Sequence, residues 1–303
     1  MNGTSGPAST FTIDGQRIAA KPLKPGLYVV ATPIGNLGDM TLRALATLAA
    51  ADMVACEDTR VSAVLLRHYG IATRLVAYHD HNAERQRPKL LAALGEGSAV
   101  ALISDAGTPL VSDPGYRLVA EAQAAGFAVV PIPGASAVLA ALVASGLPTD
   151  AFLFAGFLPP KAGARGKRLA ALAAVPATLV FFESPQRLAD SLADMAVALG
   201  TREAVVAREL TKTFETIRRG SLAELAATYG GEATPKGEIV VVVGPPAEAV
   251  TSAADAERVL ASLLAEKSVS AAAAEAAAIT GLPRRDLYQR ALALKDRQDG
   301  GKR

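Results

Sequence analysis

The chain of 303 residues carries 31 basic and 29 acidic side chains, so its formal net charge of +2 neither demands nor excludes a nucleic acid partner. Half of the residues are apolar, but no apolar stretch approaches the roughly 20 residues of a membrane-spanning helix. The single cysteine, Cys56, excludes an internal disulfide and a multi-cysteine metal site. We expect a soluble, cytoplasmic protein.

Residues 1–23 are rich in Gly, Ser, Thr and Pro and lack the apolar core of a signal peptide, so we expect a flexible N-terminal arm. From residue 24 to residue 135, short runs rich in Val, Ile and Leu alternate with helical patterns such as Leu42, Leu45 and Leu48. The runs cover residues 27–31, 53–56, 74–78, 100–103 and 127–132. This alternation predicts an α/β domain with a parallel sheet that helices cover on both faces.

A second, smaller α/β domain is predicted over residues 136–246. Its expected strands are residues 152–157, 178–183, 204–209 and 238–243, and its expected helices are residues 186–199, ended by Gly200, and 222–227. The pattern after Pro246 is wholly helical, which predicts a helix-turn-helix-like tail over residues 255–297 with a turn at 281–283. An Ala-rich packing appendage fits the same spacing. Residues 284–303 hold seven basic and three acidic side chains, so this tail offers basic surface.

Polar or glycine-containing segments follow the five strands of the first domain, where ligands bind in parallel sheets. They are residues 32–39, 57–60, 79–82, 105–109 and 133–137. One of them begins the stretch "SDAGTPLVSDPG" (104–115), which makes two acid-glycine turns in a row. Asp113 and Pro114 are typical of the N-cap and first residue of a helix, here expected over residues 116–125. The remaining turn, "DAGTP", is a candidate ligand cradle.

The five polar segments form one rim of the predicted sheet. Their residues exclude several chemistries. The chain lacks the Gly-x-Gly-x-x-Gly pattern of redox dinucleotide sites, the Gly-Lys-Ser/Thr of phosphate loops and the Gly-x-Ser-x-Gly of serine hydrolases. His79 and His81 would still need a distant carboxylate to hold a metal, so no metal is expected. S-adenosylmethionine fits better, because main-chain groups in tight loops of small residues can hold it and its displacement reaction depends mostly on alignment.

Seven motifs occur in order between residues 24 and 245: "TPIGNLGDMTLRA", "CEDTR", "SDAGTPLVSDPG", "PIPGASAVLAALVASGLP", "FAGFLP", "FFESPQRL" and "ARELTKTFE". Together they resemble the ribosomal RNA small subunit methyltransferase I family, the 16S rRNA cytidine 2′-O-methyltransferases of the tetrapyrrole methylase superfamily. The helical tail is similar to the helix-turn-helix segment of that family. The resemblance implies a two-domain α/β fold, S-adenosylmethionine in the cleft, small-subunit ribosomal RNA as substrate and a homodimer.

The resemblance also implies a set of cofactor-binding residues, because "DAGTP" stands where the tetrapyrrole methylases have a Gly-Gly-Asp-Pro cofactor loop. Thr108 departs from that pattern, since it replaces the aspartate of the loop. The residues implied are Pro33, Asp105, Ala106, Gly107, Thr108, Val111, Ser136, Ala137 and Phe182.

The acceptor site is predicted from charge and position. A ribose 2′-hydroxyl loses its proton as the methyl group arrives, and a carboxylate or a lysine can assist that step. Strand ends supply five such groups, of which Glu183, Lys212 and Glu57 are our catalytic candidates beside Asp58 and Glu209. Cations that could hold RNA phosphates are Arg60, Arg187, Arg208 and, in a basic loop over residues 161–168, Lys161 and Arg165.

Two other functions fit parts of this sequence. A methyltransferase acting on a tetrapyrrole would use the same fold, but one macrocycle needs no basic tail or basic loop. A non-catalytic RNA-binding factor in ribosome assembly would keep the basic tail, but the intact "DAGTP" loop argues against it. The favoured hypothesis is the RNA methyltransferase.

Overall fold

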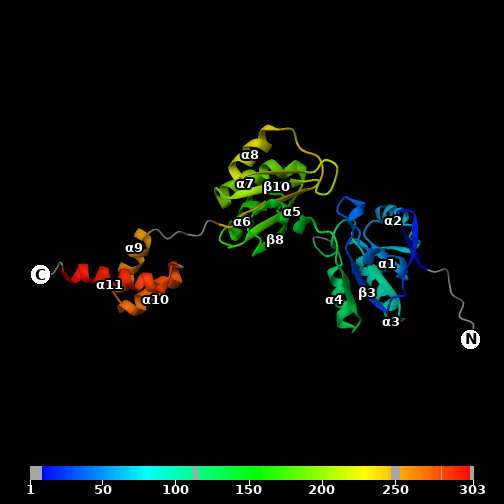
Figure 1. The fold of residues 1–303 in the computed structure, drawn as a ribbon, viewed down its shortest axis with the longest axis horizontal. Helices are drawn as coiled ribbons and strands as arrows, with labels where there is room; N and C mark the ends of the chain where they lie inside the picture. Colours follow the sequence, from blue (N-terminus) through cyan, green and yellow to red (C-terminus); the bar gives the residue numbers. More distant parts are fainter. Residues whose placement is uncertain (1–8, 112–114, 247–252, 281, 301–303) are drawn as a thin grey trace, which may run out of the picture. The chain divides into compact units, whose positions relative to one another are not determined.

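The computed structural model describes residues 9–111, 115–246, 253–280 and 282–300. The chain forms two compact units, Met1–Pro245 and Pro246–Arg303. The first unit contains two five-stranded sheets and one hairpin (Figure 1). Within the described ranges, no helix combines the length and the apolar character needed to cross a bilayer.

The first sheet is parallel, with the strand order β5-β4-β6-β3-β7. Its strands are β3 (Gly26–Val30), β4 (Met53–Cys56), β5 (Leu75–Ala77), β6 (Ala99–Leu102) and β7 (Val129–Ile132). Leu45 and Leu66 pack on one face from α1 (Leu42–Ala50) and α2 (Thr59–His68), while Leu90 and Leu118 pack on the other from α3 (Ala83–Gly95) and α4 (Tyr116–Ala124). The expectation of a parallel sheet covered on both faces is confirmed.

The second sheet is mixed, with the strand order β11-β10-β12-β9-β8 and only β8 and β9 parallel. Its strands are β8 (Phe152–Phe157), β9 (Thr178–Glu183), β10 (Glu203–Arg208), β11 (Thr216–Ser221) and β12 (Ile239–Val243). Hydrophobic residues of α6 (Ala162–Leu172), α7 (Leu188–Leu199) and α8 (Leu222–Gly231) cover one face, and α5 (Ala137–Ser145) covers the other. The sequence did not predict β11, whose central residues are the polar Arg218 and Arg219.

The expected flexible arm over residues 1–23 contains ordered structure. Strands β1 (Thr10–Ile13) and β2 (Gln16–Ala19) form an antiparallel hairpin around Asp14 and Gly15, which both have positive φ. Phe11 is buried in the core beside α1, and the Thr12 amide donates to the Tyr69 carbonyl at 2.7 Å. Burial of this aromatic ring fixes the hairpin to the first sheet, so the expectation of a loose arm is wrong for residues 10–19.

Two further expectations are corrected. The helix α4 begins at Tyr116 with Gly115 as its N-cap, at φ +124°, rather than with Asp113 as cap and Pro114 as first residue. Asp113 and Pro114 themselves lie outside the described residues. The basic loop expected over residues 161–168 is instead the first part of α6, because apolar residues such as Leu169 and Leu172 recur at helical spacing and pack on the sheet.

The second unit contains three helices in its described part: α9 (Ala253–Leu264), α10 (Val269–Thr280) and α11 (Arg284–Gly300). Their small core contains Leu260, Leu287 and four alanines. Gly281, part of the turn expected at residues 281–283, lies outside the described residues. The described part of the tail is therefore helical, as expected, and Arg285 and Lys295 are exposed on α11.

Candidate active site

The "DAGTP" loop is tied to the loop after β3 by backbone pairing. The Thr32 amide donates to the Gly107 carbonyl at 2.8 Å, and the Gly107 amide donates to the Thr32 carbonyl at 3.1 Å. Gly107 has φ +78°, and a Cβ at this position would lie 3.2 Å from Cγ2 of Ile34. The backbone conformation therefore favours glycine, and a side chain at this position would also crowd Ile34.

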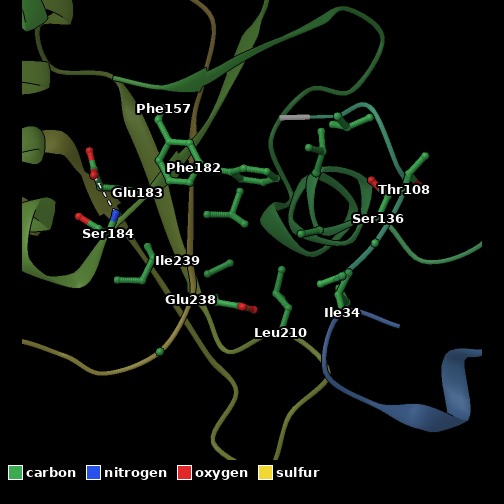
Figure 2. A pocket seen from close by; sticks show the side chains of 18 of the residues that line it. Ile34, Thr108, Ser136, Phe157, Phe182, Glu183, Ser184, Leu210, Glu238 and Ile239 are labelled. Carbon is green, nitrogen blue, oxygen red and sulfur yellow. Dashed lines mark hydrogen bonds between the residues drawn. The ribbon is translucent and has the colours of Figure 1, made fainter. Parts of the chain in front are cut away.

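A first cavity of about 400 Å³ lies between the "DAGTP" loop, the start of α5 and the ends of β9 and β12. Figure 2 shows Thr108, Ser136 and Ile34 on one side of it and Phe157, Phe182 and Ile239 on the other. Seven of the expected cofactor-binding residues line this cavity, namely Ala106, Gly107, Thr108, Val111, Ser136, Ala137 and Phe182. Sequence positions that lie up to about 75 residues apart thereby line one cavity.

Hydrogen bonds within the wall orient its polar side chains. The Thr108 hydroxyl donates to the Ala135 carbonyl at 3.1 Å, which joins the "DAGTP" loop to the loop before α5. The Ser136 hydroxyl caps α5 by accepting from the Leu139 amide. Thr108 thus stabilises the loop, and the positive end of the α5 dipole lies at the cavity wall.

A second cavity of about 380 Å³ shares Ile34, Ala106 and Glu238 with the first. Pro33 and Asp105, which we expected to bind the cofactor, line this second cavity and not the first. Ala106, the neighbour of Asp105, lines both cavities, so the two cavities meet at this loop. Asp105 instead accepts a hydrogen bond from the Asp58 amide through Oδ1, at 3.1 Å.

Lys212 also lines the second cavity. Its ammonium donates to Oε1 of Glu209 at 2.8 Å and to Oε2 of Glu238 at 3.0 Å. Its aliphatic stem lies against Gly35, where a Cβ would come within 2.5 Å of Cγ and Cε of Lys212. Burial lowers the pKa of Lys212, but the hydrogen bonds and negative charges of Glu209 and Glu238 outweigh burial and hold the pKa above its usual value. Lys212 is therefore a cation at neutral pH.

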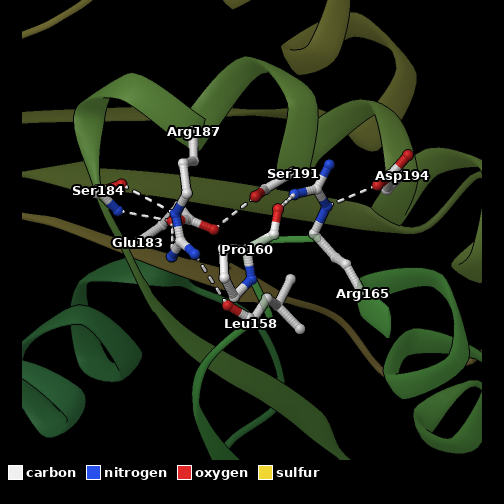
Figure 3. Close-up of polar contacts among 8 residues, drawn as sticks. All are labelled: Leu158, Pro160, Arg165, Glu183, Ser184, Arg187, Ser191 and Asp194. Atoms are coloured by element: carbon white, nitrogen blue, oxygen red, sulfur yellow. Dashed lines mark hydrogen bonds and ion pairs between the residues drawn. The ribbon is translucent and has the colours of Figure 1, made fainter. Parts of the chain in front are cut away.

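Glu183 borders the first cavity, but its carboxylate is fully enclosed (Figure 3). Oε1 accepts from the Ser184 amide at 2.7 Å and from Nη2 of Arg187 at 2.5 Å, and Oε2 accepts from the Ser191 hydroxyl at 2.6 Å. An ion pair and two further donors occupy both oxygens, so this carboxylate is not placed to accept a proton from a substrate. Glu183 acts as the anchor of Arg187, which corrects its place among the catalytic candidates.

Four of the five expected substrate-binding cations have partners within the protein, and two of them, Arg165 and Arg208, brace the fold. Arg165 is buried and pairs with Asp194 at 2.6 Å, as Figure 3 shows. Arg208 donates to Oγ1 of Thr216 and to the carbonyls of Phe214 and Lys236. Both guanidinium groups brace the fold, so we no longer expect them to contact phosphates.

The other three cations have exposed or partly exposed charges. Lys161 is exposed at the N-cap of α6, and Arg60 is exposed in the first turn of α2, where it pairs with Asp58 at 2.6 Å. Arg187 is held by Glu183, Ser184 and the Leu158 carbonyl, and about a quarter of its side chain remains exposed. These residues stay predictions as contacts for RNA phosphates.

Glu57 lines neither cavity and lies in an acidic part of the rim. Burial, followed by the negative charges of Asp105 and Asp80, raises the pKa of Glu57 above its usual value. A group of this kind is a better base than an ordinary carboxylate, but its place outside both cavities weakens the case for it. In the part of the chain that the structure describes, no cluster of three His, Cys, Asp or Glu residues is arranged to hold a metal ion.

Replacing Glu57 by Gln tests this electrostatic interpretation. A raised pKa means that the folded state holds the proton of Glu57 more tightly than the unfolded state, so its ionised form destabilises the fold above the usual carboxyl pKa. We expect Glu57→Gln to raise the Tm at pH 7 and to leave the Tm unchanged below about pH 4, where both side chains are neutral. Glu96→Gln, at an exposed helix end, is the control. A lower Tm for Glu57→Gln at pH 7 would contradict the repulsion.

Sequence reasoning missed several residues that form the cavities. Phe157 joins Phe182 at a ring-centroid distance of 5.6 Å, and Leu210 closes the first cavity near Glu238 (Figure 2). Glu238 borders both cavities. The aromatic run 152–157 indicated Phe157, and the motif "ARELTKTFE" indicated Leu210. Glu238 had no such signal, because a charged residue commonly precedes a strand.

Comparison with known proteins identifies the family. Residues 26–226 match the Tetrapyrrole (Corrin/Porphyrin) Methylases, and residues 250–295 match the RsmI C-terminal HTH domain. Ribosomal RNA small subunit methyltransferase I of Mesorhizobium japonicum is 65% identical over 288 residues, which are 94% of this chain and 98% of that protein. This chain belongs to the ribosomal RNA small subunit methyltransferase I family. The small subunit methyltransferase I proteins of Pseudomonas aeruginosa and Escherichia coli O157:H7 are 52% and 51% identical, each over 88% of this chain and over 96% and 94% of their own lengths.

Solved structures place this small subunit methyltransferase I family member in the tetrapyrrole methylase fold. Cobalt precorrin-4 methyltransferase superposes with a TM-score of 0.55 at 19% identity, over 72% of this chain and 94% of that one. Uroporphyrin-III C-methyltransferase from Thermus thermophilus, described as complexed with S-adenyl homocysteine, superposes with a TM-score of 0.51 at 22% identity, over 72% and 96% of the two chains. The fold expected from the seven motifs is confirmed.

Proposed function

We propose that this protein transfers a methyl group from S-adenosylmethionine to the 2′-hydroxyl of a cytidine in the 16S RNA of the small ribosomal subunit. The observation that carries the proposal is the pair of adjoining cavities, one walled by small residues and aromatic rings and the other containing Lys212. Relatives that match nearly the whole chain, tail included, are named for small-subunit ribosomal RNA methylation. We further propose that the protein works in the cytoplasm as a homodimer.

The residues of the first cavity fit S-adenosylmethionine, which supplies an electrophilic methyl group on a positively charged sulfur. Gly107 keeps open a space that a Cβ would fill, and the loops at residues 106–108 and 135–137 present main-chain groups at the wall. Phe182 offers an aromatic face for a flat ring. The wall is mostly apolar, as ligand pockets commonly are. These features support binding and alignment, which supply most of the rate in a direct displacement.

The direct test is methyl transfer from labelled S-adenosylmethionine. The purified protein is incubated with small ribosomal subunits from cells that lack this activity, with naked 16S RNA and with a porphyrin precursor, and the modified nucleotide is then mapped. We expect label on a cytidine ribose of the ribosomal RNA. Transfer to the porphyrin alone would indicate a small-molecule enzyme, and binding without transfer would indicate an assembly factor.

The tail should serve RNA binding rather than cofactor binding. It is a separate compact unit, so removing residues 247–303 should leave the two-sheet unit folded. Exposed Arg285 and Lys295 on α11 are suited to phosphates, and such contacts make affinity depend on salt. We expect the truncated protein to bind S-adenosylmethionine normally, but to bind small-subunit RNA more weakly and with a smaller salt slope. Equal RNA affinities and equal slopes for both proteins would exclude a nucleic-acid role for the tail.

A further inference from the structure

The second cavity is placed to receive whatever accepts the methyl group. It shares Ile34, Ala106 and Glu238 with the first cavity, and its volume of about 380 Å³ falls in the range of pockets for small organic ligands, roughly 300 to 1,000 Å³. Direct displacement requires the reacting atoms to lie about 3–3.5 Å apart. An acceptor in the second cavity would face a methyl group in the first across these shared residues.

One wall of the second cavity is apolar and exposed. Val61, Val64 and Leu65 occupy one face of α2 at helical spacing, and Leu37 lies beside them in the lining. Val61 is 46% exposed and Val64 is 61% exposed, so these side chains form an apolar surface open to a ligand. A flat apolar group such as a nucleic acid base suits this wall, because proteins that read single-stranded RNA pack splayed-out bases on their surface.

Other residues that line the second cavity are charged. Lys212 and Glu238 lie there as an ion pair of 3.0 Å, and Asp105 joins them in the lining. Glu238 also borders the first cavity, so the ammonium of Lys212 lies close to the shared wall. Outside the lining, Arg60 extends from the same helix that presents Val61 and Val64, with 89% of its side chain exposed. The ammonium of Lys212 near the shared wall suits a ribose there. The exposed guanidinium of Arg60 suits a phosphodiester chain outside the cavity.

We propose that the second cavity binds the acceptor nucleoside of the RNA, with its base against Val61, Val64 and Leu65 of α2 and its ribose toward Lys212. This inference rests on the proposed function. The nucleoside must leave its stack to enter the cavity, as in other enzymes that modify nucleotides inside a folded nucleic acid. The face of α2 is then the surface that selects and positions the base.

Val64→Glu tests this assignment. Its side chain is exposed, so the substitution leaves the core intact, but it places a carboxylate where the base would lie and repels the phosphate chain. We expect kcat/KM for methylation of small subunits to fall at least tenfold, with the Kd for S-adenosylmethionine and the Tm unchanged. Val64→Leu, which keeps the wall apolar, should retain activity. The matched control is Val197→Glu on α7, because Val197 is 89% exposed and lines neither cavity.

The outcomes separate this inference from the proposed function. Transfer by the wild-type protein and by Val197→Glu, with loss in Val64→Glu alone, supports the second cavity as the nucleoside site. If Val64→Glu methylates subunits as fast as the control, the nucleoside binds elsewhere while the proposed function stands. If Val64→Glu loses affinity for S-adenosylmethionine, the second cavity holds part of the cofactor and the inference is overturned. An inactive wild-type protein would overturn both.

Discussion

Gly107→Val should abolish the binding of S-adenosylmethionine while leaving the protein folded. Gly107 has φ +78°, which a β-branched residue opposes at a cost of about 1–3 kcal/mol, and its Cβ would lie 3.2 Å from Ile34, a residue that lines both cavities. The added methyl groups would enter the space that the cofactor needs. We expect the Kd measured by calorimetry to rise at least a hundredfold, and circular dichroism to show an intact fold with a modestly lowered Tm.

Gly126→Val separates backbone strain from loss of the site. Gly126 has φ +79°, nearly the same as Gly107, but nothing lies within 4 Å of the position of its Cβ, and it lies just beyond the end of α4. Both variants should therefore lose stability through backbone strain, to which Gly107→Val adds the contact with Ile34, and only Gly107→Val should lose the cofactor. Normal binding by Gly107→Val would mean that "DAGTP" is merely a turn.

The position of the first cavity was predictable because it depends on backbone rules. Parallel strands end on one edge of a sheet, so the residues that follow β3, β6 and β7 meet there whatever their side chains are. Small residues such as Ala106, Gly107 and Ala137 then indicate that a ligand can come close to the backbone. Seven of the nine expected cofactor residues line the first cavity, and the two exceptions, Pro33 and Asp105, line the second.

The roles of the charged residues were not predictable, because the sequence does not show which side chains pair with one another. Glu183 forms an ion pair with Arg187, four residues later, and its other carboxylate oxygen accepts a hydrogen bond from Ser191. Arg165 pairs with Asp194, which lies on the next helix. A sequence shows that a charge exists and does not show which side chain packs against it. The N-terminal hairpin is different, since Asp14-Gly15 between two alternating runs is a recognised signal for such a turn.

Lys212 is held by a loop that accepts backbone strain. Glu209 and Thr211 both have positive φ, at +54° and +66°, a conformation that costs non-glycine residues about 1–3 kcal/mol each. Hydrogen bonds hold the loop in place, since the Glu209 amide donates to the Glu238 carbonyl at 2.9 Å and the Thr211 amide donates to Oε2 of Glu215 at 2.6 Å. Strain maintained in this way beside a cavity points to a function for the side chain that the loop carries.

Lys212→Met should greatly reduce methyl transfer, because it removes the cation and keeps the stem that packs on Gly35. With a raised pKa, Lys212 is charged at neutral pH and is suited to stabilise negative charge that develops on the acceptor oxygen, an effect worth about a hundredfold to a thousandfold in kcat for one such donor. We expect kcat on small subunits to fall by at least a hundredfold with the Kd for S-adenosylmethionine unchanged, and Lys212→Arg to recover part of the loss. Lys167→Met, at an exposed position on α6, controls for the loss of a surface charge. A kcat within threefold of the wild type, with a lowered Tm, would instead make Lys212 a structural clamp between Gly35 and Glu238.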